Sequence, residues 1–479
     1  MAIFLTALAD RIPDDDRSLD ARGVAFVMSF AGFAFAGFVI LVYTLQRLGM
    51  PDNLSASLLA AWIVLSVLLA SWLGRSVSGP RFFFAARKAD AISVGIGGAS
   101  CWLSGALIAV FFALPNGDGF ILIAALLLGL ALQTFLMAAP INVSGASSVP
   151  GLLIRRFGNR YVGFVCLVAY ALVLCPLALA ELEVAVRLFG VLSGFGTVKS
   201  VWIVCGLALL PIMFGGWQAF LLVNACVGIW ILFSMLSPAL LIGFFPFLLD
   251  GNAQSGGAVL EPLRISQSTA LINSGTPLTA ATALLVYAAG FAALPQTIAR
   301  SSLMSSRIAA VEGQGWTGLV VFLSLSALLL SIGLIINSGA QSTLGKLLQS
   351  SGIISALPYA AIFLAAFNAL SVTLFTAAIT VVRAIGADGN REPGVGSMFA
   401  VRLLAIILAG ALLYTRDYAD VALARLVLSA LAIAAAGLFP VLIFSLWSSK
   451  PTALFATSAM VCGTGGACAA FYYGSFDIA

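Results

Sequence analysis

Thirteen apolar segments, each long enough to cross a lipid bilayer, follow one another along this 479-residue sequence with no soluble domain between them. Hydrophobic residues make up 62% of the chain and charged residues only 9%. A water-soluble domain cannot bury so much apolar surface. The sequence therefore predicts an all-α polytopic membrane protein with about 13 transmembrane helices. The segments are expected near residues 24–46, 55–74, 91–113, 119–139, 161–187, 200–216, 218–246, 277–299, 316–338, 356–386, 397–415, 420–447 and 452–473.

The loops between these segments differ in their content of basic residues. If the N-terminus lies in the cytoplasm, most loop arginines and lysines fall on the cytoplasmic side, among them Arg155, Arg156 and Arg160. The positive-inside rule then predicts a cytoplasmic N-terminus and an external C-terminus, and we expect the protein in a bacterial cytoplasmic (inner) membrane. Residues 1–22 are expected to form a soluble lead, and residues 247–276, rich in Gly, Ser and Gln, an extracellular loop.

The residue content argues against several classes of function. Histidine is absent, and none of the seven cysteines has metal-ligand spacing such as CxxC, so no metal or haem site is expected. We expect the cysteines to be small buried hydrophobic residues. No catalytic motif, phosphate-binding loop or basic run is present, so the sequence predicts no enzyme, no resident cofactor and no nucleic-acid partner.

The segment 91–113 is interrupted by small residues that do not favour a continuous helix. They are Gly95, Gly97, Gly98, Ser100, Ser104 and Gly105. The segment 277–299 has small residues at a similar depth, namely Ala288, Ala289 and Gly290. Broken helices near the bilayer midplane form the substrate site in many secondary transporters. The alternative is that these small residues only let neighbouring helices pack closely.

Three stretches together resemble the sodium/solute symporter family, which includes sodium/glucose, proline and pantothenate transporters. They are RFFFAARKADAISVGIGGASCWLSGA (81–106), SVPGLLIRRFGNRY (148–161) and GFAALPQTIARSS (290–302), in the family's order and at about its spacing. The resemblance implies the LeuT-type five-plus-five inverted repeat.

On that fold the chain divides into a core and peripheral helices. Residues 91–246 would form core repeat one, and residues 277–447 would form core repeat two. Two peripheral transmembrane helices within 23–74 would precede the core, and one within 452–473 would follow it.

The resemblance also implies a sodium site between the first and eighth core helices. The carbonyl groups of Ser100 and Leu103 would lie at this site, but the two hydroxyl positions on the eighth helix hold Asn368 and Ala369. A second acidic position of the family holds Asn224. Ser100, Leu103, Asn368 and Asn224 are therefore candidate ion ligands, whereas Ala369 offers no oxygen. The alternative is that Asn224 and Asn368 only form hydrogen bonds between helices.

Glu181 and Glu183 are the acids that lie well inside an apolar segment. A carboxylate at the bilayer centre costs about 2.5–3.5 kcal/mol, so it must be paired, protonated or facing water. Glu183 can pair with Arg187 one helical turn later. Glu181 points away from that pair and is the candidate for proton coupling. The alternative is a neutral or hydrogen-bonded glutamate near the extracellular end. The coupling ion is thus left open between Na⁺ and H⁺.

These observations predict secondary active transport of a small polar solute. The site would lie between the broken helices 91–113 and 277–299, lined by Ser100, Cys101, Ser104, Tyr287 and Asn368. No unpaired arginine or lysine within the apolar segments marks a site for an anion. The alternative is a symporter-like module that has lost transport and serves as a sensor or as a subunit of a larger membrane complex, with partner membrane subunits.

Overall fold

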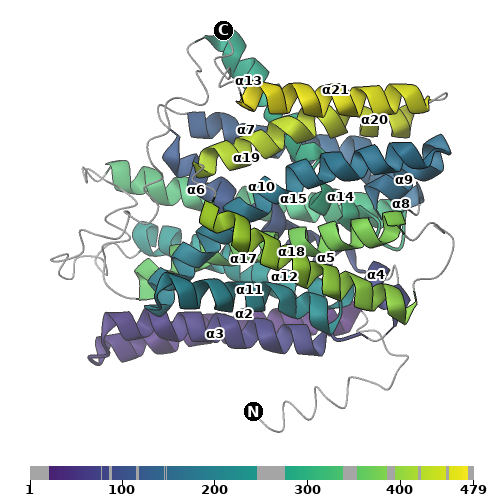
Figure 1. Ribbon diagram of the computed structural model, residues 1–479. Coiled ribbons are helices and arrows are strands. Elements are labelled where there is room, and N and C mark those ends of the chain that lie inside the picture. The colour runs from purple at the N-terminus through teal and green to yellow at the C-terminus, as the bar shows by residue number, and fades with distance from the viewer. Residues whose placement is uncertain are drawn as a thin grey trace.

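The computed structural model describes residues 21–76, 78–85, 89–114, 118–144, 146, 148–244, 276–337, 353–385, 394–418, 422–448 and 452–472. Every regular element in these ranges is a helix (Figure 1). The helices are α2 (Ala21–Arg47), α3 (Asp52–Leu73), α4 (Gly79–Phe84), α5 (Ala91–Trp102), α6 (Gly105–Ala113), α7 (Asp118–Leu132), η2 (Gln133–Ala138), α8 (Ala139–Ser144), α9 (Val149–Phe157), α10 (Arg160–Ser193), α11 (Thr197–Phe214), α12 (Trp217–Phe244), α13 (Pro277–Ala292), α14 (Pro295–Ser301), α15 (Arg307–Asn337), α17 (Ile353–Ile385), α18 (Val395–Tyr418), α19 (Leu423–Ile433), η5 (Ala434–Leu438), α20 (Phe439–Trp447) and α21 (Ala453–Tyr472).

The expected thirteen membrane spans are confirmed. Within the described ranges, eleven helices are long and apolar enough to cross a membrane, and two bent helix pairs, α5 with α6 and α13 with α14, raise the number to thirteen. Two of the eleven are composite, because α7, η2 and α8 run on as one span, as do α19, η5 and α20, with π-helical turns between them. The protein is therefore an integral membrane protein.

The order of the spans is that of a five-plus-five repeat with two leading helices and one trailing helix. Helices α2 and α3 lie along one edge of the bundle, and α21 lies along the opposite edge (Figure 1). Each set of five spans between them opens with a bent pair: α5 and α6 in the first set, α13 and α14 in the second. The two breaks thus occupy corresponding positions in the chain. The expected loop 247–276 lies outside the described residues, except for Thr276.

The centre of the bundle is formed by α17. Of its most apolar stretch, 94% is buried, compared with 28% for α2 and 17% for α21. α17 packs against α10, α12 and both halves of the first broken span. Side chains that point away from this centre, such as Phe33 on α2 and Leu454 on α21, are exposed and apolar, as expected for lipid-facing positions. Any polar group on the inner face of α17 is consequently shielded from both water and lipid.

Short helices gather at one end of the bundle. α9 is formed by the second family-like stretch; it buries Val149, Leu152 and Leu153 and ends with Arg155 and Arg156. Arg156 donates to the backbone carbonyls of Ser445 and Ser448, which ties α9 to the end of α20. α14 contacts α8 and α9, and these three helices lie towards the same end of the bundle (Figure 1).

Three glycines of the first broken span, Gly95, Gly97 and Gly98, are not where the helix breaks. α5 runs through Gly95, Gly97 and Gly98 as regular helix and ends at Trp102. A Cβ atom added at Gly98 would collide with Thr317 of α15, whose hydroxyl donates to the carbonyl of Gly95. The expectation that these three glycines interrupt the helix is therefore wrong, whereas Ser104 and Gly105, which belong to the same predicted set, do lie at the break. Gly95 and Gly98 allow α15 to approach α5 closely, and Gly97 allows α12 to do so.

The expectation for the cysteines also needs correction. Five of the seven are buried or half-buried, but Cys175 and Cys462 are exposed. Both lie on membrane-spanning helices, where a small apolar side chain can face lipid as readily as protein.

Candidate functional site

The first break separates α5 from α6 at Leu103 and Ser104, with a bend of 47°. The Ser104 hydroxyl accepts a hydrogen bond from the backbone N–H of Leu107, so this side chain caps the N-terminus of α6. The same hydroxyl donates to a carboxylate oxygen of Glu181 on α10. The other carboxylate oxygen of Glu181 accepts the N–H of Ala106 at 3.0 Å. Glu181 is fully buried, and its carboxyl group lies at the positive end of the α6 dipole.

The second break separates α13 from α14 at Ala293 and Leu294, with a bend of 52°. Pro295 begins α14, and because proline has no backbone N–H, it cannot continue the hydrogen bonding of α13. Thr297 closes the first turn of α14 by donating to the carbonyl of Leu294 at 2.8 Å. The break follows Ala288, Ala289 and Gly290 rather than coinciding with them. A Cβ atom at Gly290 would meet the backbone of Leu431, so this glycine also serves close packing.

Four polar side chains converge beside the first break. The Asn368 amide group of α17 donates to the Ser100 hydroxyl at 2.5 Å and to the Cys101 sulfur at 3.3 Å. The Arg300 guanidinium of α14 donates from Nη2 to the same sulfur at 2.7 Å. Ser100, Cys101, Arg300 and Asn368, here called the Cys101 cluster, thus join α5, α14 and α17, and all four are buried. Three of these residues were predicted site residues, and the structure brings them together.

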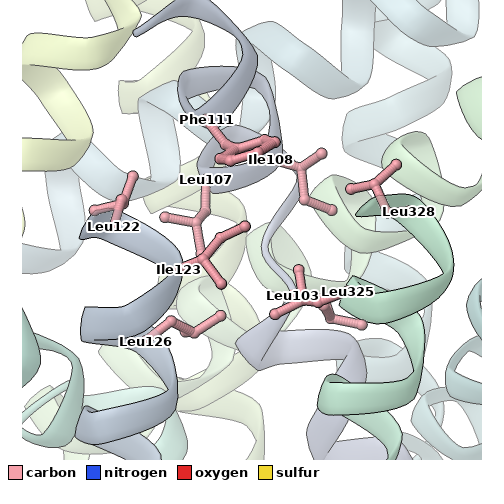
Figure 2. Close-up of a pocket in the computed structure, with 9 residues that line it drawn as sticks. All are labelled: Leu103, Leu107, Ile108, Phe111, Leu122, Ile123, Leu126, Leu325 and Leu328. Carbon is pink, nitrogen blue, oxygen red and sulfur yellow. The ribbon is translucent and has the colours of Figure 1, made fainter. Parts of the chain in front are cut away.

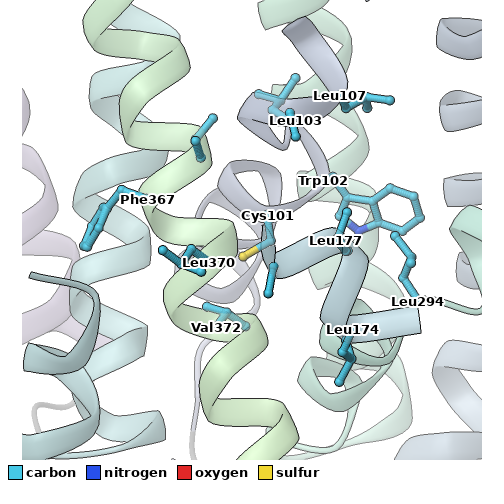
Figure 3. Close-up of a cluster of buried hydrophobic side chains, with 14 of the residues drawn as sticks. Cys101, Trp102, Leu103, Leu107, Leu174, Leu177, Leu294, Phe367, Leu370 and Val372 are labelled. Carbon is cyan, nitrogen blue, oxygen red and sulfur yellow. The ribbon is translucent and has the colours of Figure 1, made fainter. Parts of the chain in front are cut away.

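Apolar side chains surround the Cys101 cluster. Cys101 lies in a buried cluster with Trp102, Leu177, Leu294 and Leu370 (Figure 3). In these surroundings electrostatic interactions are strong, and a polar atom without a partner is costly.

Two polar atoms of the Cys101 cluster have no hydrogen-bond partner. They are Oδ1 of Asn368 and Nε of Arg300. Gln133 and Gln296, on η2 and α14, also have buried side-chain atoms without a partner. Most buried polar groups in proteins are satisfied, so such atoms near a helix break mark places where a bound molecule would be stabilised.

The other predicted site residues lie elsewhere. Tyr287 is buried on α13, and Leu103 lines a small apolar cavity. Asn224 of α12 packs against Gly97 of α5, and its Oδ1 has no partner. In the described part of the chain, neither Tyr287 nor Asn224 is hydrogen-bonded to the Cys101 cluster.

Beyond Leu103 the space between the helices is filled by apolar side chains. A cavity of about 10 Å³ remains between α6, α7 and α15, into which Leu107, Phe111, Leu126 and Leu325 also point (Figure 2). This volume holds about one water molecule. A route from the breaks to that end of the bundle would require these apolar side chains to separate.

Arg300 is the functional candidate that the sequence analysis missed. The predicted segment 277–299 ends just before it, and no arginine within the apolar segments is expected to mark an anion site, yet the side chain of Arg300 is only 4% exposed. The expectation is wrong because the chain continues as α14 beyond the second break and turns Arg300 towards α5. The signal was present in the third family-like stretch, where an arginine follows the break-forming proline by five residues.

The pairing predicted for Glu183 is confirmed. Its carboxylate lies 2.6 Å from Arg187, and Arg416 of α18 binds the other oxygen at 2.7 Å. Glu181 is hydrogen-bonded, as the alternative interpretation expected: among the described residues it has no cationic partner, but it receives hydrogen bonds from Ser104 and Ala106. Those donors belong to a helix 75 residues earlier in the chain, so helical spacing on α10 could not reveal them.

The residues at the expected sodium position fit a hard cation poorly. The Ser100 hydroxyl already donates to the carbonyl of Gly97 and accepts from Asn368. Asn368 Oδ1 is an open oxygen, Ala369 supplies none, and the positive charge of Arg300 lies in contact with the adjacent Cys101. A dehydrated cation needs several oxygen ligands and is repelled by a neighbouring guanidinium.

Comparisons with known proteins place the fold. No family model matches this sequence, and no curated protein matches it. A structure of the substrate-bound outward-open state of a Na⁺-coupled sialic acid symporter superimposes with a TM-score of 0.64 at 13% identity, covering 89% of this chain and 97% of that one. A manganese transporter from Eremococcus coleocola, in complex with an aromatic bis-isothiourea substituted compound, gives a TM-score of 0.49 at 18% identity, covering 80% and 88%.

These neighbours are membrane transporters and not enzymes. At such low identity the likeness to the symporter concerns the fold alone. The chain therefore has a LeuT-like fold of about thirteen spans with two leading helices and one trailing helix.

Proposed function

We propose that this protein is a secondary active transporter, related to the sodium/solute symporters, that moves a small polar solute across the cytoplasmic membrane. The observation that carries the proposal is the convergence of buried polar groups on two helix breaks at corresponding positions of the two repeats. Discontinuous helices of this kind form the substrate site near the bilayer midplane in secondary transporters. The three family-like stretches and the similarity to a symporter fold support the same reading.

The solute site in this proposal is the Cys101 cluster together with Ser104 and Tyr287. Asn368 Oδ1 offers an unfilled acceptor to a solute hydroxyl or amino group. Burial of that oxygen without a partner costs about 1–3 kcal/mol, so a solute that donates to it gains affinity. Ser104 and Tyr287 complete the set of solute-binding residues that the sequence predicts. Ser104 caps the N-terminus of α6, and Tyr287 lies on α13.

Coupling to protons, or to no ion, suits the residues better than coupling to two sodium ions. Glu181 is a buried carboxylate that binds directly to the first break. Its contacts with Ser104 and Ala106 all use carboxylate oxygens as acceptors, so they favour the ionised group. Protonation would weaken them and free α6 from α10, which links proton uptake to the geometry of the break. Asn224 and Ala369, in contrast, remove ligands from both sodium positions.

Solute uptake into proteoliposomes tests this proposal. A panel of labelled sugars, amino acids and carboxylates should include a solute that wild type accumulates or exchanges. Asn368→Ala should reduce that uptake at least tenfold. Ser371→Ala is the matched control, because Ser371 is equally buried on the same helix but donates to Ala208 of α11.

Absence of uptake for the whole panel would contradict transport. If membrane subunits then co-purified with the protein in fixed stoichiometry, the sensor or subunit hypothesis would replace it. Equal effects of Asn368→Ala and Ser371→Ala would contradict the assigned site while leaving transport intact.

A further inference from the structure

Arg300 carries a positive charge inside the membrane-spanning bundle, and no acid among the described residues pairs with it. It lies on α14, directly after the second break, with its side chain 4% exposed. One nitrogen, Nη2, donates to the Cys101 sulfur, and Nε has no partner. A thiol is a weak, uncharged acceptor, so this contact does not neutralise the guanidinium.

The two acids that lie well inside apolar segments already have partners. Glu181 accepts from Ser104 and Ala106, and Glu183 binds Arg187 and Arg416. Across the described ranges no carboxylate lies within ion-pair distance of Arg300. A buried cation is normally paired or bound to an anion, because taking it out of water is expensive. The described part of the chain therefore leaves the charge of Arg300 without an anion to balance it.

We propose that Arg300 receives the carboxylate of a transported monoanion, a proposal that rests on the transport function above and names its substrate class. A guanidinium binds a carboxylate through two parallel N–H donors, and Arg300 has an unused Nε beside an Nη2 that only the thiol occupies. The single positive charge of Arg300 is balanced by the single negative charge of one carboxylate. A phosphate group carries roughly one negative charge more, which Arg300 alone would not balance.

Two neighbouring contacts narrow the class further. Asn368 donates to the same sulfur atom as Arg300, so its open Oδ1 lies close enough to meet a second group of the same solute. That oxygen accepts hydrogen bonds, so the second group is a donor such as a hydroxyl. The N-terminus of α6, which could otherwise bind an anion, is already occupied by Glu181. The chemistry thus fits a hydroxylated monocarboxylate held between α14 and α17.

Binding to the purified full-length protein tests this assignment without requiring transport. Thermal unfolding in lipid nanodiscs is followed against increasing glycolate, lactate and gluconate, each compared with its amide. The members of each pair differ in charge and hardly in shape. Wild type should respond to at least one carboxylate at a concentration about tenfold lower than to the matching amide, because hydrogen bonds to a charged group are the stronger ones.

Three variants separate charge from structure. Arg300→Gln should abolish the preference for the carboxylate, a loss of about tenfold to a hundredfold in affinity. Cys101→Asp keeps the arginine but gives it an internal carboxylate, so it should also abolish the preference and should raise the unfolding temperature without solute. Ser371→Ala is the control, because Ser371 is buried on the same helix as Asn368 but donates to Ala208 of α11, so this variant should keep the preference. If Arg300→Gln does not fold, Cys101→Asp still tests whether the carboxylate preference depends on the free charge of Arg300.

The outcomes distinguish this proposal from the one it rests on. Equal responses to carboxylates and amides, no response to any carboxylate, or an unchanged preference in Cys101→Asp would overturn the role of Arg300. Uptake of neutral solutes in that case would leave transport standing. A carboxylate preference that Arg300→Gln or Cys101→Asp abolishes, without uptake of any solute, would support the anion site and contradict transport.

Discussion

Glu181 joins two helices that lie far apart in the sequence. Its carboxylate binds Ser104 and Ala106 at the start of α6, while its own helix is α10. Because these donors satisfy a buried carboxyl group at a helix N-terminus, the contact stabilises the bent geometry of the break. The geometry of the break therefore depends on a single ionisable group.

Ser104→Ala tests this contact. The change removes the hydroxyl that caps α6 and donates to Glu181, so unfolding free energy should fall by about 1–3 kcal/mol. Equilibrium unfolding in mixed micelles gives the measurement. Ser71→Ala is the control, since Ser71 is also buried but its hydroxyl has no partner among the described residues. Equal destabilisation by both changes would show that the contact with Glu181 contributes nothing.

The residue contacts that the sequence predicts are those within one helix. Glu183 and Arg187 were expected to pair because they are one turn apart, and they do. The partners of Glu181 and the contact between Arg300 and Cys101 were not expected, because 77 and 199 residues separate them. No local pattern reports which side chains meet across packed helices.

At the scale of elements, the glycines of α5 govern how two spans pack. Gly95, Gly97 and Gly98 lie within the regular helix α5 and allow both α15 and α12 to pack closely against it. The break itself follows from Ser104 and its cap, and in the second repeat from Pro295. The small residues predicted that each span is unusual, but in the first span only Ser104 and Gly105 of the predicted set lie at the break. The pattern cannot separate the two roles, because a glycine both weakens a helix and permits close packing.

Gly98→Ala tests the packing role. The added methyl group would collide with the side chain of Thr317, so the unfolding free energy should fall by about 1–3 kcal/mol. Adding Thr317→Ala should recover part of that loss, although it also removes the hydrogen bond to Gly95. Gly410→Ala on α18 is the control, since nothing lies near its added Cβ atom. Thermal unfolding of the four proteins is the measurement, and equal effects of Gly98→Ala and Gly410→Ala would contradict this account.

At the scale of the whole molecule, thirteen spans could be predicted because hydrophobic length alone defines a membrane helix. The five-plus-five order was expected from three short stretches, and the fold agrees with it. The side of the membrane on which each loop lies stays a prediction that rests on the basic residues.

Labelling of single cysteines tests that orientation. In intact cells, a membrane-impermeant reagent should modify Lys346→Cys, in the connection between α15 and α17, and should leave Arg155→Cys unmodified until the cells are broken. The exposed native Cys175 and Cys462 are replaced by alanine beforehand, so that they give no background. Modification of both positions from the same side would show that the count of spans or the orientation is wrong.

Uptake under separate ion gradients tests the central claim, a transporter whose broken-helix site works without sodium. Proteoliposomes are given either an inward sodium gradient or an inward proton gradient, with wild type and Glu181→Gln compared. We predict that a sodium gradient alone drives no accumulation, and that any proton-driven accumulation is lost in Glu181→Gln while solute exchange continues. Steep sodium dependence that Glu181→Gln leaves unchanged would instead mean that Ser100, Leu103 and Asn368 form a working sodium site, and would contradict this account.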